Sequence, residues 1–147
     1  MKKIILLAAI AMAACMGGAA KIYAAEGNAS VTALSDESFR STVYDYVNSP
    51  SKWNYKGGKV AVIDFYADWC GPCRMVSPLL DALAGEYGGR VAFYKVNVDD
   101  NRQTAAFFRI NAIPLVMVVP VGGEPVKILG ARGKDDYRAA IEKALKK

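Results

Sequence analysis

The chain has 147 residues, of which 53% are hydrophobic and 22% charged, and this length suits one domain with a buried core plus an extra segment. It contains no histidine, which excludes Cys-His proteolysis, histidine-ligated zinc or haem, and every imidazole general base. The net charge is +5, but Lys2, Lys3 and Lys21 supply three of those charges, so the rest of the chain gives no reason to expect binding to nucleic acid or adhesion to a membrane.

The N-terminus has the pattern of an export signal. Met1–Lys3 is basic, and residues 4–14 form an apolar run that is too short to span a bilayer but is typical of a secretory signal. Small residues follow this run and fit cleavage by a signal peptidase. The pattern predicts a signal peptide over residues 1–20, a polar linker over residues 21–30 and a folded domain over residues 31–147.

A cysteine directly after the apolar run allows a second ending for the signal. Ala13–Gly17 is similar to a bacterial lipoprotein signal, in which Cys15 becomes a lipidated N-terminus. Met12 stands where such signals usually have leucine, which favours release as a soluble protein. We therefore expect membrane attachment only if Cys15 is lipidated. A buried N-terminal helix is the alternative without export.

The first part of the domain predicts a strand, a helix and a loop. Residues 31–34 predict a short strand, and Ser35 with the acidic residues after it predicts the start of a helix. One face of this helix is expected to carry four apolar residues: Phe39, Val43, Tyr46 and Val47. Residues 48–59 contain one proline and two glycines and predict a loop, over which Trp53 and Tyr55 are expected to pack.

The middle of the domain predicts two strands and two helices. An apolar run over residues 60–67 predicts a buried strand, and a helix bent at Pro78 is expected after it. The core-facing residues of that helix keep a helical spacing: Val76, Leu79, Leu80, Leu83 and Tyr87. Residues 91–98 predict a further strand. A short helix ending near Phe108 follows, and three polar residues are expected to cap it: Asp99, Asp100 and Asn101.

The C-terminal part predicts a hairpin and a helix. Two apolar runs, residues 115–119 and 125–129, flank the sequence Val-Gly-Gly-Glu at 121–124, which is typical of a hairpin. The last helix has an apolar face made of Tyr137, Ala140, Ile141, Ala144 and Leu145. The complete order of elements is βαβαβαββα. This order predicts an α/β fold with a central mixed β-sheet flanked by helices on both faces.

Cys70 and Cys73 are the two cysteines of the expected folded part, and they lie between the strand at 60–67 and the helix after it. The first sulfur then lies at a helix N-terminus, which favours a thiolate. We expect Cys70 to be the exposed, low-pKa nucleophile and Cys73, one turn later, to be the buried resolving thiol. The alternatives are an inert turn and a metal site. Two cysteines cannot close a four-thiolate zinc site, but a metal shared by two protomers stays open.

Four other residues each have a structural and a functional interpretation. Asp64 is either an exposed or hydrogen-bonded structural acid, or a buried acid with a raised pKa that takes the Cys73 proton directly or through water. Lys95 either faces solvent or lies near Asp64 and tunes its proton affinity. Pro114 either initiates a strand or forms a cis bond. Trp69 either belongs to the core or shields the sulfur pair.

These residues together resemble the thioredoxin family over about residues 31–145. The resemblance rests on an ordered set: Asp64–Cys73, Pro78, Lys95–Asp99, Ile113–Pro114 and Gly130. It implies a thioredoxin fold in which Cys70 is the nucleophile, Cys73 the resolving thiol and Asp64 the buried acid. It also implies a cis Pro114 facing the sulfurs and a reaction that needs no metal and no organic cofactor.

The resemblance further implies a groove that binds an extended segment of a disulfide-containing protein. Its expected residues are Trp69, Gly71, Pro72, Ile113 and Pro114, with Gly130 and Ala131 at the margin. The backbone of Ile113 would pair with the substrate strand. Four features depart from the family pattern and leave the substrate preference open: Tyr66, Leu115, the longer loop at 48–59 and Gly122–Gly123.

Together with the export signal, the resemblance implies a protein-disulfide reductase in the periplasm. Gly71 and Pro72 between the cysteines resemble reducing thioredoxins rather than strong periplasmic oxidants. Because the periplasm has no nicotinamide supply, we expect a membrane thiol carrier as electron donor, with a monomeric protein acting on disulfide-containing proteins. The alternatives are a disulfide oxidase or isomerase, a dedicated reductase for cytochrome c maturation, and a non-catalytic binding module of the same fold.

Overall fold

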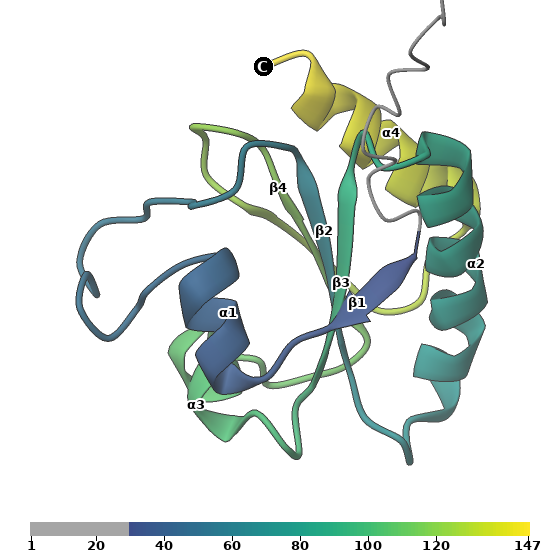
Figure 1. Cartoon of the computed structure of the whole chain (residues 1–147). Helices are drawn as coiled ribbons and strands as arrows, with labels where there is room; N and C mark the ends of the chain where they lie inside the picture. Colours follow the sequence, from purple (N-terminus) through teal and green to yellow (C-terminus); the bar gives the residue numbers. More distant parts are fainter. Residues whose placement is uncertain (1–29) are drawn as a thin grey trace, which may run out of the picture.

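The computed structural model describes residues 30–147, so the predicted signal peptide, Cys15 and the linker up to residue 29 lie outside the described residues. Five strands and four helices follow one another in the predicted order (Figure 1): β1 (Val31–Ala33), α1 (Asp36–Thr42), β2 (Ala61–Tyr66), α2 (Gly71–Tyr87), β3 (Ala92–Asn97), α3 (Arg102–Phe107), β4 (Leu115–Val119), β5 (Val126–Leu129) and α4 (Lys134–Leu145). None of the described helices is long and apolar enough to cross a membrane.

The five strands form one mixed sheet in the order β1-β3-β2-β4-β5. β1 and β2 run parallel to β3, whereas β4 runs antiparallel to both of its neighbours, β2 and β5. The turn between β4 and β5 contains Gly122 with a φ of +71°, a backbone conformation that glycine adopts without steric cost. The topology confirms the predicted α/β fold and the predicted hairpin.

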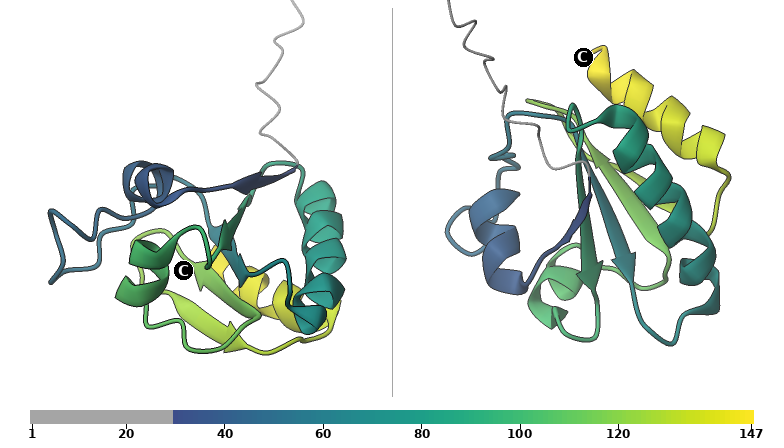
Figure 2. Two further views of the ribbon diagram at one scale, coloured as in Figure 1. Left: turned by 90° about the horizontal axis from the view of Figure 1, so that it is seen from below. Right: turned by 45° about the vertical axis from the view of Figure 1, so that its right-hand side comes forward.

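Helices cover both faces of the sheet: α2 and α4 lie on one face, and α1 and α3 lie on the other (Figures 1 and 2). Successive side chains in and around β2 point to opposite faces of the sheet, so this segment contributes to the hydrophobic core on each face. Val60 and Val62 belong to the core beneath α2 and α4, whereas Ile63 and Phe65 pack with Phe108 in the core on the other face. Apart from Asp64, the strand is apolar because both of its faces are buried.

α2 carries the cysteine pair at its first turn. Cys70 is the N-cap residue, and its Sγ accepts a hydrogen bond from the backbone N–H of Cys73 at 3.3 Å. The helix continues past Pro78, which lacks a backbone donor, and ends at Gly88, whose φ of +54° stops the helical repeat. A helix of 17 residues therefore holds the pair at the end of β2, next to Tyr66.

The structure corrects two predicted helix features. The first helix ends at Thr42, so Tyr46 and Val47 do not lie on its face. The chain turns after this helix instead. Tyr46 is buried, and its hydroxyl forms a hydrogen bond with that of Thr104, whereas Val47 is 54% exposed. Asn101 precedes α3 but makes no side-chain cap, because its amide donates to a carbonyl of the preceding turn.

The loop between α1 and β2 is held against the sheet by aromatic contacts. The indole N–H of Trp53 donates to the carbonyl oxygen of Gly123 in the β4–β5 turn at 2.9 Å. The Trp53 ring centroid lies 4.7 Å from that of Tyr44 and 6.2 Å from that of Phe108. Tyr55 packs against the same core, with its hydroxyl donating to a carbonyl at the end of the loop. These contacts confirm the predicted packing of Trp53 and Tyr55.

Candidate functional site

Cys70 and Cys73 form a disulfide at the junction of β2 and α2, with their Cα atoms 5.3 Å apart. Cys70 is 3% exposed and Cys73 is 2% exposed. The prediction that Cys70 is exposed is therefore wrong for the disulfide form, because the pair packs into a small apolar cluster with Ala67, against Tyr66 and Ile113. Within residues 30–147, no group of three Asp, Glu, Cys or His residues is placed to hold a metal ion.

Asp64 lies in β2 and is 2% exposed, so the interpretation as an exposed acid is wrong. Its Oδ1 has no hydrogen-bond partner within residues 30–147. Burial has the largest effect on this carboxyl group and raises its pKa to about 7. Near neutral pH the group can therefore both accept and return a proton.

Two charged residues modify the proton affinity of Asp64. Lys95 is its register partner on the parallel strand β3, and the positive charge of Lys95 lowers the pKa of Asp64. The Lys95 side chain is nevertheless exposed, with its Nζ 6.0 Å from the centroid of the Tyr66 ring. The negative charge of Asp81 on α2 acts in the opposite direction and raises the pKa of Asp64. Lys95 thus faces solvent and also affects Asp64.

A cavity of about 290 Å³ lies beside the cysteine pair. It is lined by Tyr66, Ala67, Asp68, Cys73, Arg74, Ser77, Pro78 and Asp81. Within α2, the lining residues Cys73, Ser77 and Asp81 are four residues apart and therefore share one helix face. The cavity has room for water and polar groups to hydrogen-bond it, so it provides a route between the Cys73 side of the disulfide and solvent.

Trp69 lies next to the disulfide and is 67% exposed, which favours its interpretation as a shield over that as a core residue. Its indole N–H donates to Oδ2 of Asp99 at 2.8 Å. The loop that carries Asp99 is ordered in turn by Asn97, whose Oδ1 accepts from the Asp99 backbone N–H at 3.0 Å. The Asn97 side-chain amide donates to Asp68 at 3.4 Å. This network fixes the ring at the surface beside the sulfur pair.

The opposite wall of the site comes from the residues just before β4. The Ile113–Pro114 bond is cis, and Ile113 packs against the cluster that contains the cysteines. The carbonyl oxygen of Pro114 accepts from the backbone N–H of Gly130 at 2.8 Å, which places Gly130 at the margin. Within residues 30–147, no hydrogen bond engages the backbone of Ile113. Its N–H and C=O can therefore pair with an added strand.

The remaining residues of the predicted groove lie at the surface around this wall. Gly71 and Pro72 form the exposed first turn of α2, and Ala131 is exposed directly after Gly130. The segment that follows is held by Tyr137, whose hydroxyl accepts from the backbone N–H of residue 132 at 3.1 Å. The structure thus places Ile113 against the cysteine pair and Gly71, Pro72 and Ala131 at the surface. Asp64 lies in β2, the strand that leads to the pair, and its carboxyl group is affected by Ser77 and Asp81, which line the cavity beside Cys73.

Sequence reasoning missed two polar residues of the site, Ser77 and Asp81. Their signal was present in the sequence, because positions 77 and 81 follow Cys73 at helical spacing and must share its side of the helix. Both line the cavity, and Ser77 donates its hydroxyl to the carbonyl oxygen of Cys73 at 3.2 Å.

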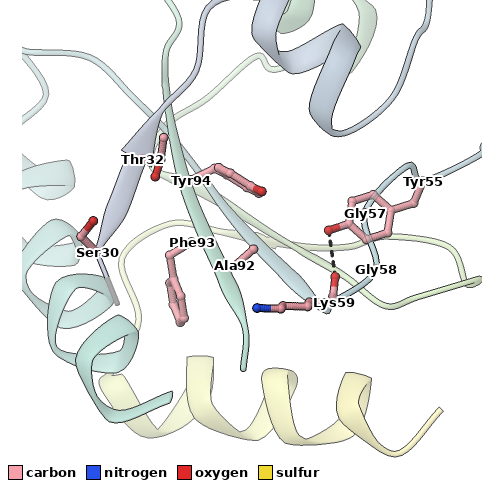
Figure 3. Close-up of a pocket in the computed structure, with 9 residues that line it drawn as sticks. All are labelled: Ser30, Thr32, Tyr55, Gly57, Gly58, Lys59, Ala92, Phe93 and Tyr94. Carbon is pink, nitrogen blue, oxygen red and sulfur yellow. Dashed lines mark hydrogen bonds between the residues drawn. The ribbon is translucent and has the colours of Figure 1, made fainter. Parts of the chain in front are cut away.

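A second cavity, of about 410 Å³, lies at the other end of the parallel strands, where β1 and β3 begin (Figure 3). Its lining residues are Ser30, Thr32, Tyr55, Gly57, Gly58, Lys59, Ala92, Phe93 and Tyr94. The Tyr55 hydroxyl donates to the Lys59 carbonyl, and the Lys59 ammonium donates to the Gly89 carbonyl at 2.7 Å. The lining contains no thiol and no carboxyl side chain, so this cavity cannot perform the same chemistry.

Comparison with known proteins agrees with this geometry. The family model described as Thioredoxin matches residues 30–143. The thioredoxin of Borreliella burgdorferi is 35% identical over 109 residues, covering 74% of this chain and 92% of that protein. The thioredoxin of Staphylococcus saprophyticus is 45% identical over 87 residues, covering 58% of this chain and 83% of that protein.

A solved structure supports the same fold. The crystal structure of chloroplastic thioredoxin z superposes with a TM-score of 0.68, covering 80% of this chain and 96% of that chain at 22% sequence identity. Taken with the family match and the disulfide between Cys70 and Cys73, these likenesses identify the chain by both sequence and fold. The chain belongs to the thioredoxin family and is a disulfide oxidoreductase of the thioredoxin type.

Proposed function

We propose that this chain is an exported protein-disulfide reductase that works by dithiol–disulfide exchange. The observation that carries the proposal is the Cys70–Cys73 pair at the N-terminus of α2, beside a cavity whose lining residues Ser77 and Asp81 act on the buried carboxyl group of Asp64. In the reduced chain, the helix N-terminus and the backbone N–H of Cys73 stabilise Cys70 as a thiolate, which is the reactive form of a thiol.

In the first step, the Cys70 thiolate attacks one sulfur of a substrate disulfide. A new S–S bond joins Cys70 to the substrate, and the second substrate sulfur leaves as a thiolate. The substrate segment lies between Trp69 and the Ile113–Pro114 wall, where the unpaired backbone of Ile113 offers one donor and one acceptor. Gly130 borders this groove through its hydrogen bond to Pro114.

In the second step, the sulfur of Cys73 attacks the sulfur of Cys70. The Cys73 thiol proton passes to the Asp64 carboxylate, directly or through water in the adjoining cavity. The mixed disulfide breaks, the Cys70–Cys73 disulfide forms, and the other substrate sulfur leaves as a thiolate. The two substrate thiolates then take up one proton released by Asp64 and one from solvent, so the substrate has gained two electrons and two protons. Lys95 keeps the pKa of Asp64 from rising further, which leaves part of the carboxyl groups ionised at neutral pH.

Reduction in the periplasm needs a source of electrons. We place the chain there because of the predicted signal peptide, and we expect a membrane protein with a dithiol to reduce the Cys70–Cys73 disulfide after each turnover. The groove and the pair suffice for exchange by a monomer, so no second copy of the chain takes part in the proposed reaction.

The redox potential of the pair tests the direction of electron flow. We expect a redox potential of about −270 mV, as for reducing thioredoxins, rather than about −120 mV, as for strong periplasmic oxidants. The fraction of disulfide is measured by thiol alkylation and mass spectrometry after equilibration in dithiothreitol buffers of stepped ratio, with the Cys73→Ser variant as the control that cannot form the internal disulfide. A value above about −180 mV would instead assign the chain to disulfide oxidation or isomerisation.

The mass of the mature protein tests whether the chain is exported and whether its signal is cleaved near Lys21 or lipidated at Cys15. Purification from the source cells should give a soluble protein that begins near Lys21, measured by intact-mass spectrometry of the native chain. A chain that begins at Cys15 with a lipid mass would show membrane anchoring. Recovery of the full 147-residue chain would contradict export.

A further inference from the structure

Ser77 occupies a position between the resolving cysteine and the buried acid. It follows Cys73 by one turn of α2, and its hydroxyl donates to the carbonyl oxygen of Cys73 at 3.2 Å. It lines the same cavity as Cys73 and Asp81. Ser77 and Asp64 project toward each other from α2 and from the face of β2 that α2 covers, and a hydrogen bond from Ser77 lowers the pKa of Asp64, which favours the ionised carboxylate. A serine hydroxyl has a single hydrogen, so it cannot donate to the Cys73 carbonyl and to Asp64 at the same time.

The surroundings of Asp64 leave a place for such a donor. Its Oδ1 has no hydrogen-bond partner within residues 30–147, and an ionised carboxylate at a buried position is costly without donors. The titratable groups that act on it or are acted on by it come from its own strand, β3, α2 and α4, and they are Tyr66, Lys95, Asp81 and Tyr137. Its partner on β4, Val116, is apolar.

We propose that Ser77 is a positioning residue whose hydroxyl alternates between the Cys73 carbonyl oxygen and the Asp64 carboxylate. The structure shows the hydroxyl donating to the Cys73 carbonyl, and we assign this arrangement to the state in which Asp64 is protonated. When Asp64 is ionised, the hydroxyl turns to the carboxylate and supplies the missing donor. The inference rests on the proposed role of Asp64 as proton acceptor for Cys73.

This alternation of the Ser77 hydroxyl couples the ionisation of Asp64 to the attack by Cys73. Before the second step, the Ser77 hydroxyl holds the Asp64 carboxylate and keeps it ionised. The Cys73 thiol proton then moves to Asp64, the hydroxyl returns to the Cys73 carbonyl, and the Cys73 sulfur forms its bond to Cys70. No atom of Ser77 is exchanged in this sequence, because Ser77 only changes the acceptor of its hydrogen bond.

The ionisation of Asp64 in the reduced full chain tests the proposal. The carboxyl carbon of Asp64, labelled with ¹³C, is followed by NMR from pH 5 to pH 9. Ser77→Ala should raise the midpoint by about 0.5 to 1 pH unit, because a hydrogen bond to the charged form is lost. Ser77→Thr keeps the hydroxyl and should restore the midpoint of the unaltered protein.

The matched control is Ser41→Ala, since Ser41 makes the same kind of bond, to the Ser38 carbonyl at 3.0 Å, on the far side of the sheet. It should leave the Asp64 midpoint unchanged. An unchanged or lowered midpoint in Ser77→Ala, or a failure of threonine to restore it, would overturn the role of Ser77. The NMR midpoint does not depend on turnover, so it tests the role of Ser77 only. The proposed role of Asp64 is tested separately by the Asp64→Asn variant.

Discussion

Replacement of Cys70 by serine is expected to abolish disulfide reduction, with a loss of more than about 1,000-fold in turnover, because a hydroxyl is not ionised at neutral pH and cannot replace the thiolate nucleophile. The measurement is the reduction of insulin by the pre-reduced protein, followed by turbidity or thiol release. The substitution is nearly isosteric at a site that is 3% exposed, so the fold should be retained and can be checked by circular dichroism.

The matched control is Cys73→Ser, which removes the second sulfur and keeps the first. It should also lose turnover, but it should still complete the first step and accumulate one substrate molecule per chain. Full turnover by Cys70→Ser would contradict the assignment of the nucleophile. Substrate binding that is unaffected by loss of both thiols, with no insulin reduction by the intact protein, would favour the non-catalytic binding module instead.

Asp64→Asn is expected to slow the second step by about 10- to 100-fold at pH 7, because the amide cannot accept the Cys73 proton. It is also expected to stabilise the protein by about 2 to 4 kcal/mol at pH 8, since it removes a buried carboxylate. Asp64 therefore lowers the free energy of unfolding at alkaline pH, but it is needed for fast disulfide exchange.

The sign of the stability change follows from the two pKa values of Asp64. Burial raises the pKa in the folded protein to about 7, whereas the unperturbed value is 3.8. Between these values the folded state holds one more proton than the unfolded state, so the free energy of unfolding contributed by Asp64 falls as the pH rises from about 4 to 7. The asparagine variant has no such decline.

The measurement is urea unfolding of both proteins, in the same redox state, at pH 4.5 and pH 8. The stability difference between variant and unaltered protein should grow with pH. Asp81→Asn is the matched control, because Asp81 is an exposed acid of the same cavity and acts on Asp64 only through its charge. It should lower the pKa of Asp64 and retain turnover. A stability difference that is the same at both pH values would contradict the buried, proton-holding state of Asp64.

The fold could be predicted from the sequence because its signals are local. The strands are short and mostly apolar and lie between turn residues, and the β2–α2 junction is marked by Cys70-Gly71-Pro72-Cys73. Asp64 was identifiable because a carboxyl group inside an apolar run is costly unless it is paired or functional. The boundary of α1 was not predictable, because Tyr46 is buried through a hydroxyl contact with Thr104, 58 positions away.

The details of the site depend on contacts that no local pattern encodes. The burial of Cys70 in the disulfide comes from its packing with Ala67 and Ile113, and Ile113 is far away in the sequence. The exposed position of Trp69 depends on its hydrogen bond to Asp99. Ser77 has the spacing of a site residue, but its bond to the Cys73 carbonyl becomes visible only in three dimensions.

The identity of the adduct trapped in the Cys73→Ser variant tests most directly whether Cys70 is the nucleophile. The reduced variant is incubated with a disulfide-containing protein such as insulin, alkylated and digested, and the cross-linked peptide is sequenced by mass spectrometry. We expect one substrate peptide joined through a disulfide to Cys70. The absence of any Cys70-linked peptide, with the substrate still being reduced, would contradict it.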